Sequence, residues 1–190
     1  MTILAIDPGL AFCGYAVLST KYTLEHLETS GTIIPKRLLR GIERHLWLLS
    51  KIQDLIRTWQ PTVLALEDFV WMTVQNGERP VIGRDSMAKL VGGIEALSLF
   101  PPYPLLYEVL SSKWGTQLVG SRRHTKADIA CVVNLRLRTT FRGDFHDNHE
   151  ADAVGIALVV NDLLMQQMYQ ESHTFPAASG PARQRALAVL

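Results

Sequence analysis

Two acidic residues stand at the ends of apolar runs that predict β-strands. Asp7 follows the run TILAI and precedes a Pro-Gly turn, and Glu67 closes the run TVLALE. In open α/β sheets, sites form at the carboxyl ends of strands, so these two carboxylates converge if their strands are neighbours. A third acid, Asp152, stands three residues after His149 at the start of a helical pattern, which places both on one face of the first turn. These four residues form a candidate site drawn from remote parts of the chain.

The chemistry of such a site depends on what relieves the repulsion between its carboxylates. Carboxylates without cationic partners are costly to fold close together, and a divalent cation offsets that cost. Mg²⁺ suits oxygen ligands, and two such ions roughly 3.5–4 Å apart can activate a water and stabilise a departing 3′-oxygen. The pattern therefore predicts metal-assisted phosphodiester hydrolysis. Each acid alone also has a structural interpretation, as a turn former, a strand end or a helix-start charge, and only their combination favours a site.

The elements that must position these residues are predicted from hydrophobic periodicity and turn residues. Strands are predicted at residues 2–6, 13–19, 29–34, 62–67 and 104–109, and helices at 36–59, 84–99, 111–119, 125–138 and 149–170. Three meander strands come first and alternating units follow, which implies an α/β fold with a mixed sheet and helices on both faces. The segment 68–83 between a strand and a helix carries aromatic residues that are unusual for a loop.

The whole-chain properties indicate one globular domain. The chain has 190 residues, 47% of them hydrophobic, and no apolar stretch of the roughly 18 residues that a membrane helix needs. No secretory signal is visible, and Cys13 and Cys131 are predicted to be buried, reduced thiols, which together favour a cytoplasmic protein. The net charge of +1 does not by itself indicate a nucleic-acid binder. However, one basic face can form from the basic runs KRLLRGIER (36–44), SRRHTK (121–126) and RLRTTFR (136–142).

Three motifs, LAIDPGLAFCGYAVL, VLALEDFVWM and HEADAVGIAL, resemble the acidic motifs of RuvC-type Holliday-junction resolvases in the ribonuclease H-like superfamily. The similarity extends over residues 2–165. It implies a ribonuclease H-like mixed five-stranded sheet, with three antiparallel meander strands plus parallel strands and helices on both faces. One nuclease domain would span residues 1–170, followed by a flexible tail at 171–190.

The resemblance also implies roles for the acidic residues. Asp7, Glu67 and Asp152 match the family's first-strand, second and last acids, and His149 falls where members carry Asp or His. All four are then expected to be catalytic metal ligands for two Mg²⁺ ions, with Mn²⁺ also accepted. His149 fits Mn²⁺ somewhat better and is either a ligand or a proton carrier.

The resemblance further implies contacts to branched DNA. Phe69 and Trp71 lie in the loop where the family stacks an aromatic side chain on bases opened at the junction centre; a small satellite core under the loop is the alternative. The expected phosphate contacts are Lys113, Arg122, Arg123 and Lys126, and Lys126 is also the expected neighbour of the scissile phosphate. SRRHTK replaces the family's usual Gly-rich loop, which leaves junction selectivity open.

The resemblance implies a two-fold homodimer that nicks two opposed strands of a four-way junction, with a branch-migration motor as a further partner. Residues 84–99, with the small pair Gly92-Gly93, are the candidate interface. Three alternatives remain open: a ribonuclease H-like nuclease for other branched nucleic acids, a junction binder that does not cut, and an actin-like nucleotide-binding protein. The last conflicts with the chain's length and its lack of a second glycine-rich phosphate turn.

Overall fold

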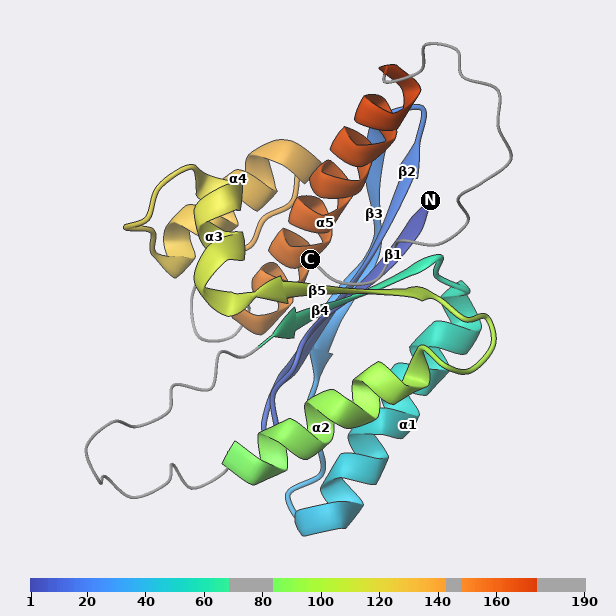
Figure 1. Ribbon diagram of the computed structural model, residues 1–190. Helices are drawn as coiled ribbons and strands as arrows, with labels where there is room; N and C mark the ends of the chain where they lie inside the picture. Colours follow the sequence, from blue (N-terminus) through green and yellow to red (C-terminus); the bar gives the residue numbers. More distant parts are fainter. Residues whose placement is uncertain (69–83, 143–147, 174–190) are drawn as a thin grey trace, which may run out of the picture.

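A computed structural model of the protein describes residues 1–68, 84–142 and 148–173 (Figure 1). Five strands form a single sheet in the order β3-β2-β1-β4-β5. Their bounds are Thr2–Asp7 (β1), Cys13–Lys21 (β2), Leu24–Ile33 (β3), Val63–Asp68 (β4) and Leu105–Leu110 (β5). β1, β2 and β3 are antiparallel neighbours, whereas β4 runs parallel to β1 and β5 parallel to β4. The expected mixed five-stranded α/β sheet is confirmed.

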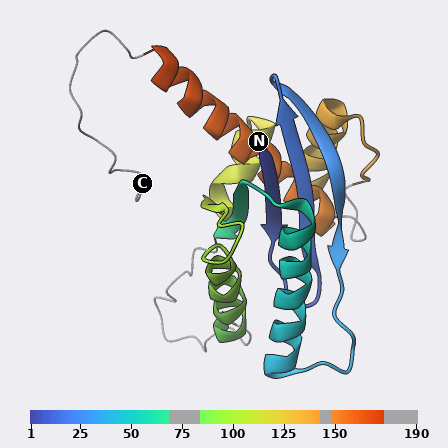
Figure 2. The same ribbon diagram turned by 90° about the vertical axis from the view of Figure 1, so that its right-hand side faces the viewer.

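The helices cover both faces of this sheet. They are α1 (Gly41–Trp59), α2 (Arg84–Leu97), α3 (Ser111–Val119), α4 (Lys126–Leu137) and α5 (Asn148–His173). Figures 1 and 2 show α1 and α2 on one side of the sheet and α3, α4 and α5 on the other. Successive side chains of a strand point to opposite faces, so Ile3 and Ala5 join the core under α5, while Leu4 and Ile6 join the core under α1 and α2.

Among the element boundaries that differ from the sequence prediction, those of β3, α1 and α5 differ most. β3 begins at Leu24 rather than at residue 29, because its pairing with β2 continues to the tight turn after Lys21. α1 begins at Gly41 rather than at residue 36, since Arg40 is extended and Gly41 has φ +51°, so Leu38 lies exposed outside the helix. α5 runs on to His173. Residues 174–190 lie outside the described residues, and the flexible tail stays a prediction.

Two further expectations concern burial and hydropathy. Cys13 is buried as predicted, but the prediction for Cys131 is wrong: it is exposed on α4, whose neighbouring residues Ile129, Ala130 and Val133 form the packed face. No helix within the described ranges combines the length and the apolar character that spanning a membrane requires.

Candidate active site

Three buried carboxylates meet at one end of the sheet. Asp7 is the last residue of β1, and Glu67 lies near the end of β4, the parallel neighbour of β1, so both strands deliver their acids to the same edge. Asp152 comes from the first turns of α5, which packs across β1 and β2. The exposed fractions of Asp7, Glu67 and Asp152 are only 5%, 8% and 5%. The convergence predicted from strand ends is therefore present in the fold.

Gly14 allows α5 to approach the sheet at this point. It pairs with Asp7 across the β1–β2 ladder, and a Cβ atom placed on it would lie 1.9 Å from the backbone oxygen of His149. No side chain fits such a contact, since a Cβ this close would overlap the carbonyl. The start of α5 thus rests directly on β2 beside Asp7.

His149 is held between Asp7 and Phe12. Its Nδ1 lies 2.7 Å from Oδ2 of Asp7, and its ring stacks on that of Phe12 with centroids 5.9 Å apart and an interplanar angle of 11°. The hydrogen bond to Asp7 raises the pKa of His149, and burial opposes that rise. His149 can therefore donate to Asp7 from Nδ1 and leaves Nε2 as a second proton-carrying atom.

Glu67 is oriented by Trp114 of α3. The indole Nε1 donates a hydrogen bond of 2.9 Å to Oε1 of Glu67. Burial, together with a hydrogen bond to the neighbouring Asp7, raises the pKa of Glu67 to about 8, while the Trp114 bond opposes the shift. A carboxyl group with this pKa shares a proton with its neighbour when no cation is close.

Asp152 is bonded on one side only. Its Oδ2 accepts a hydrogen bond from the Lys126 ammonium, whereas its Oδ1 is buried without any hydrogen-bond partner. Burial raises the pKa of Asp152, and the bond to Lys126 opposes that shift. Lys126 begins α4, whose start is fixed by a capping box between Thr125 and Asp128, and its ammonium also lies 6.0 Å from the centroid of the Trp114 ring.

The donor set fits a hard divalent cation. Within residues 1–68, 84–142 and 148–173, no three His, Cys, Asp or Glu side chains are arranged as a complete set of metal ligands. Instead, His149 bonds to an oxygen of Asp7, and Lys126 bonds to an oxygen of Asp152. However, one buried oxygen of Asp152 has no hydrogen-bond partner, and burial raises the pKa values of both Glu67 and Asp152, so their charged forms lack the solvation that water would give. A cation with oxygen ligands relieves both conditions.

The predicted DNA contacts are only partly covered by the structure. Lys113 lies exposed on α3, and Arg122 and Arg123 lie exposed on the connection from α3 to α4. That connection leads directly to Lys126, which bonds to Asp152. Phe69 and Trp71 lie outside the described residues, and their stacking role stays a prediction.

Sequence reasoning missed three residues that shape the site: Trp114, Phe12 and Gly14. Trp114 lies in an amphipathic helix, where a buried tryptophan is ordinarily a core residue, and nothing in its neighbours points to Glu67. Gly14 carried a usable signal, because a glycine inside a strand often marks a close approach of another backbone.

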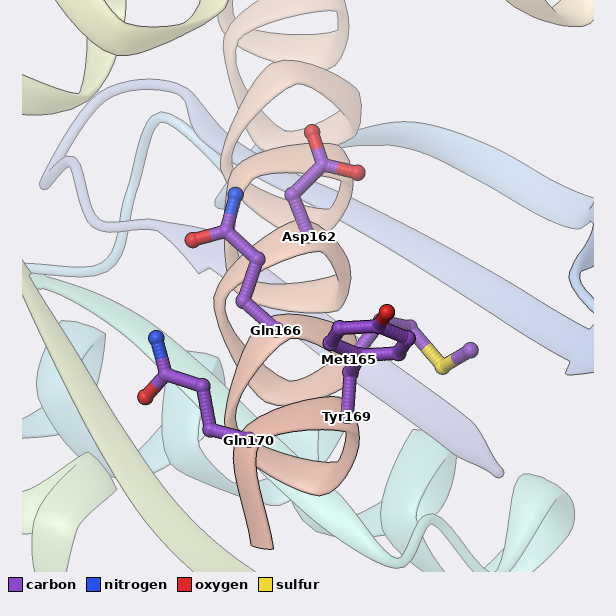
Figure 3. Close-up of a pocket in the computed structure, with 5 residues that line it drawn as sticks. All are labelled: Asp162, Met165, Gln166, Tyr169 and Gln170. Carbon is purple, nitrogen blue, oxygen red and sulfur yellow. The ribbon is translucent and has the colours of Figure 1, made fainter. Parts of the chain in front are cut away.

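A depression on α5 lies apart from the acidic cluster. Figure 3 shows a depression of about 330 Å³ on the outer half of α5, lined by Asp162, Met165, Gln166, Tyr169 and Gln170. All five side chains come from one helix, and Asp162 is ion-paired with Arg136. This depression brings no second element to a ligand and offers no catalytic group beyond that acid.

The fold and this site define a class of protein, and comparison with known proteins names the family. A family model described as "Crossover junction endodeoxyribonuclease RuvC" matches residues 3–160. The chain therefore belongs to the RuvC family of crossover junction endodeoxyribonucleases.

Individual relatives agree with this assignment. The crossover junction endodeoxyribonuclease RuvC of Prochlorococcus marinus (strain AS9601) is 28% identical over 160 residues, which cover 83% of this chain and 94% of that protein. The RuvC of Prochlorococcus marinus (strain MIT 9303) is 39% identical over 72 residues, or 36% and 45% of the two chains.

Solved structures support the fold. T. thermophilus RuvC in complex with a Holliday junction substrate has a TM-score of 0.70 and 19% identity, and the match covers 88% of this chain and 96% of that chain. The fowlpox virus Holliday junction resolvase has a TM-score of 0.54 and 14% identity, covering 86% of this chain and 99% of that chain. At these identities the likeness speaks for the fold alone.

The bond from Trp114 to Glu67 makes Trp114 a positioning residue. Trp114→Phe keeps the ring but removes the indole N–H, and we expect it to weaken Mn²⁺ binding about 10–100-fold, as loss of a group that orients a ligand does. Titration calorimetry with Mn²⁺ measures this effect, and Trp59→Phe on α1 is the matched control. Equal Mn²⁺ affinity in the Trp114→Phe protein and wild type would show that Trp114 only fills space.

Proposed function

We propose that this protein is a metal-dependent endonuclease that resolves four-way DNA junctions by nicking two opposed strands. The observation that supports this most strongly is the meeting of Asp7, Glu67 and Asp152, from three separate elements, at one edge of a ribonuclease H-like sheet in a chain of the RuvC family. Buried acids without enough cations are destabilising, so their retention together argues against a binder that does not cut.

The metal we propose is Mg²⁺, with Mn²⁺ as an accepted substitute and two ions per site. Asp7, Glu67 and Asp152 would supply oxygen ligands, and His149 would join them on turning away from Asp7. When bound, the ions would supply Lewis acidity for the attacking water and for the departing 3′-oxygen.

The protein's own side chains orient the groups of this site. Trp114 holds the Glu67 carboxylate, and Gly14 lets the first turn of α5 bring His149 and Asp152 beside Asp7. The side chain of Lys126 is half exposed, so its ammonium can leave Asp152 for a phosphate oxygen of the substrate. We propose that His149 either binds metal or carries a proton at Nε2.

The remaining cations would hold the DNA. Lys113, on α3, and Arg122 and Arg123, on the connection to Lys126, are exposed, so they can contact backbone phosphates without reading the base sequence. Phe69 and Trp71 belong to this proposal as stacking residues for opened bases, which is worth on the order of 1–3 kcal/mol per base.

Symmetric nicking requires two sites, and we propose a homodimer through α2. On this helix Gly93 packs against Leu49 of α1, whereas Gly92 is exposed with nothing within 4 Å of its Cβ position. The face around Gly92 is therefore open to a second copy. A branch-migration motor is a further proposed partner, and we expect the enzyme to act in the cytoplasm.

The test compares three labelled substrates: a four-way junction, a fork and a linear duplex, each with Mg²⁺ or Mn²⁺. We expect paired, symmetric nicks in the junction and at least about tenfold slower cleavage of the other two. Equal rates on all three would instead favour the ribonuclease H-like nuclease for branched nucleic acids in general. Tight junction binding with no cleavage in either metal would favour the non-cutting binder.

A further inference from the structure

The three basic runs of the sequence have different surroundings in the structure. Arg136, from the third run, is ion-paired with Glu25 of β3 and Asp162 of α5, so it braces the fold. Arg122 and Arg123, from the second run, lie exposed on the connection that leads to Lys126. The first run, KRLLRGIER, contributes three arginines to a pocket that the proposed catalytic chemistry does not use.

This arginine pocket has a volume of about 350 Å³ and lies between the start of α1 and the start of α2. Its lining includes Arg37, Arg40 and Arg44, together with Leu10 and Ser86, and it contains no Asp or Glu. Within the described part of the chain, none of the three arginines takes part in an ion pair; the nearest carboxylates in sequence, Glu43 and Asp85, do not line the pocket. Among the described residues, three cations thus face a common space that no carboxylate lines.

Two features keep the walls of the pocket in place. The buried His45 bridges them, since its Nδ1 lies 2.7 Å from the backbone oxygen of Gly41 in α1 and its Nε2 lies 2.7 Å from that of Ser86 in α2. Arg44 is anchored by a hydrogen bond of 3.1 Å from its Nε to the backbone oxygen of Leu39. The pocket is therefore a built feature of the fold.

The backbone at the start of α1 adds to the attraction for an anion. Arg40 is the N-cap residue, and its side chain makes no capping bond to the first-turn N–H groups. The N–H of Glu43 donates to the backbone oxygen of Arg40, but the other N–H groups at the start of this 19-residue helix and the positive end of its dipole favour negative charge. Gly41, which also lines the pocket, presents no side chain that would cover this backbone.

The pocket lies close to the acidic site. Leu10, which lines the pocket, follows Asp7 by three residues, so their Cα atoms are at most about 11 Å apart. Phosphates recur about every 3.4 Å along the axis of one DNA strand, so a span of at most about 11 Å corresponds to at most about three nucleotides. An anion in the pocket and a phosphodiester at the acids can belong to the same DNA arm.

We propose that the arginine pocket binds a backbone phosphate of the junction arm, a few nucleotides from the cleaved bond, and so anchors the DNA that enters the active site. The planar guanidinium group matches phosphate through two parallel hydrogen bonds, and no base-reading is implied. This inference rests on the proposed function, since it takes DNA as the ligand.

The test uses the double variant Arg37→Gln/Arg40→Gln, because both side chains are exposed while Arg44 is bonded to Leu39. The matched control, Lys51→Gln/Arg57→Gln, removes two charges from the far part of the same helix. Junction affinity is measured without divalent metal at several salt concentrations. We expect about a tenfold weaker Kd for the pocket variant at low salt and a salt slope smaller by about one, as for one lost phosphate contact, with no such change in the control.

Three outcomes separate this inference from its alternatives. A pocket variant that matches the control in both Kd and salt slope overturns it. Loss of inorganic phosphate binding in calorimetry, with DNA affinity unchanged, also overturns it and marks a site for a small phosphate ligand. The third outcome is that the pocket variant loses affinity equally for a linear duplex and for the junction. If the wild type in addition cuts the duplex and the junction at the same rate, the phosphate anchor stands and the junction-specific function fails.

Discussion

Asp7→Asn is expected to slow junction cleavage by at least about 10³-fold while the Kd for the junction stays within about threefold. Asp7 is 5% exposed and shares hydrogen bonds with His149 and Glu67. Substituting a neutral amide removes a charged oxygen ligand, and Lewis-acid stabilisation of several kcal/mol corresponds to about three powers of ten in rate. Single-turnover cleavage of a labelled four-way junction measures the rate, and a gel shift without divalent metal measures the binding.

The matched control is Asp54→Asn, an exposed acid of α1 whose partner is the exposed Lys51, and it should cut at the wild-type rate. A second readout is thermal: Mg²⁺ or Mn²⁺ should raise the Tm of the wild type, because binding to the folded state alone stabilises it. The Asp7→Asn protein should lose most of that shift. Wild-type cleavage by Asp7→Asn would refute the role proposed for this residue.

Gly14→Ala is expected to lower the free energy of unfolding by about 3 kcal/mol or more. The new methyl group would meet backbone atoms, and no flexible side chain can move aside to relieve the overlap. The added Cβ would lie 1.9 Å from the backbone oxygen of His149, so α5 must move away from β2. For a chain of this size the Tm should fall by about 6–12 °C. Because His149 and Asp152 move with α5, cleavage at temperatures where the variant is folded should also fall strongly. Calorimetry and junction cleavage check the two effects.

Gly92→Ala is the comparison for this prediction. In one protomer the new Cβ would meet nothing within 4 Å, so replacing a mid-helix glycine should raise stability by about 1 kcal/mol. A Gly14→Ala protein as stable as wild type would contradict the close contact between β2 and α5.

The sequence alone determined the architecture and the residue types of the site. Apolar runs of strand length end at Asp7 and Glu67. The helix that begins beside Asp152 is rich in Ala, Val, Ile and Leu, and it packs on the sheet because this removes those side chains from water. Since neighbouring parallel strands end at the same side of a sheet, these patterns predict that the acids meet if β1 and β4 are neighbours, and the sheet order fulfils that condition. The late start of α1 could not be predicted in this way. Residues 36–39 continue the helical periodicity of α1, but the extended Arg40 separates them from the helix.

Only the tertiary structure decided how the acids are held and where other charges go. The bond from Trp114 to Glu67, the bond from Lys126 to Asp152 and the contact of Gly14 with His149 join residues far apart in the chain. Likewise, the run KRLLRGIER has the composition of an ordinary solvated segment. Its arginines line a pocket only because Leu10 and Ser86 of α2 lie beside them in the fold. Periodicity reports which face of an element is buried, but the partner across that face depends on packing between elements, which no local pattern encodes.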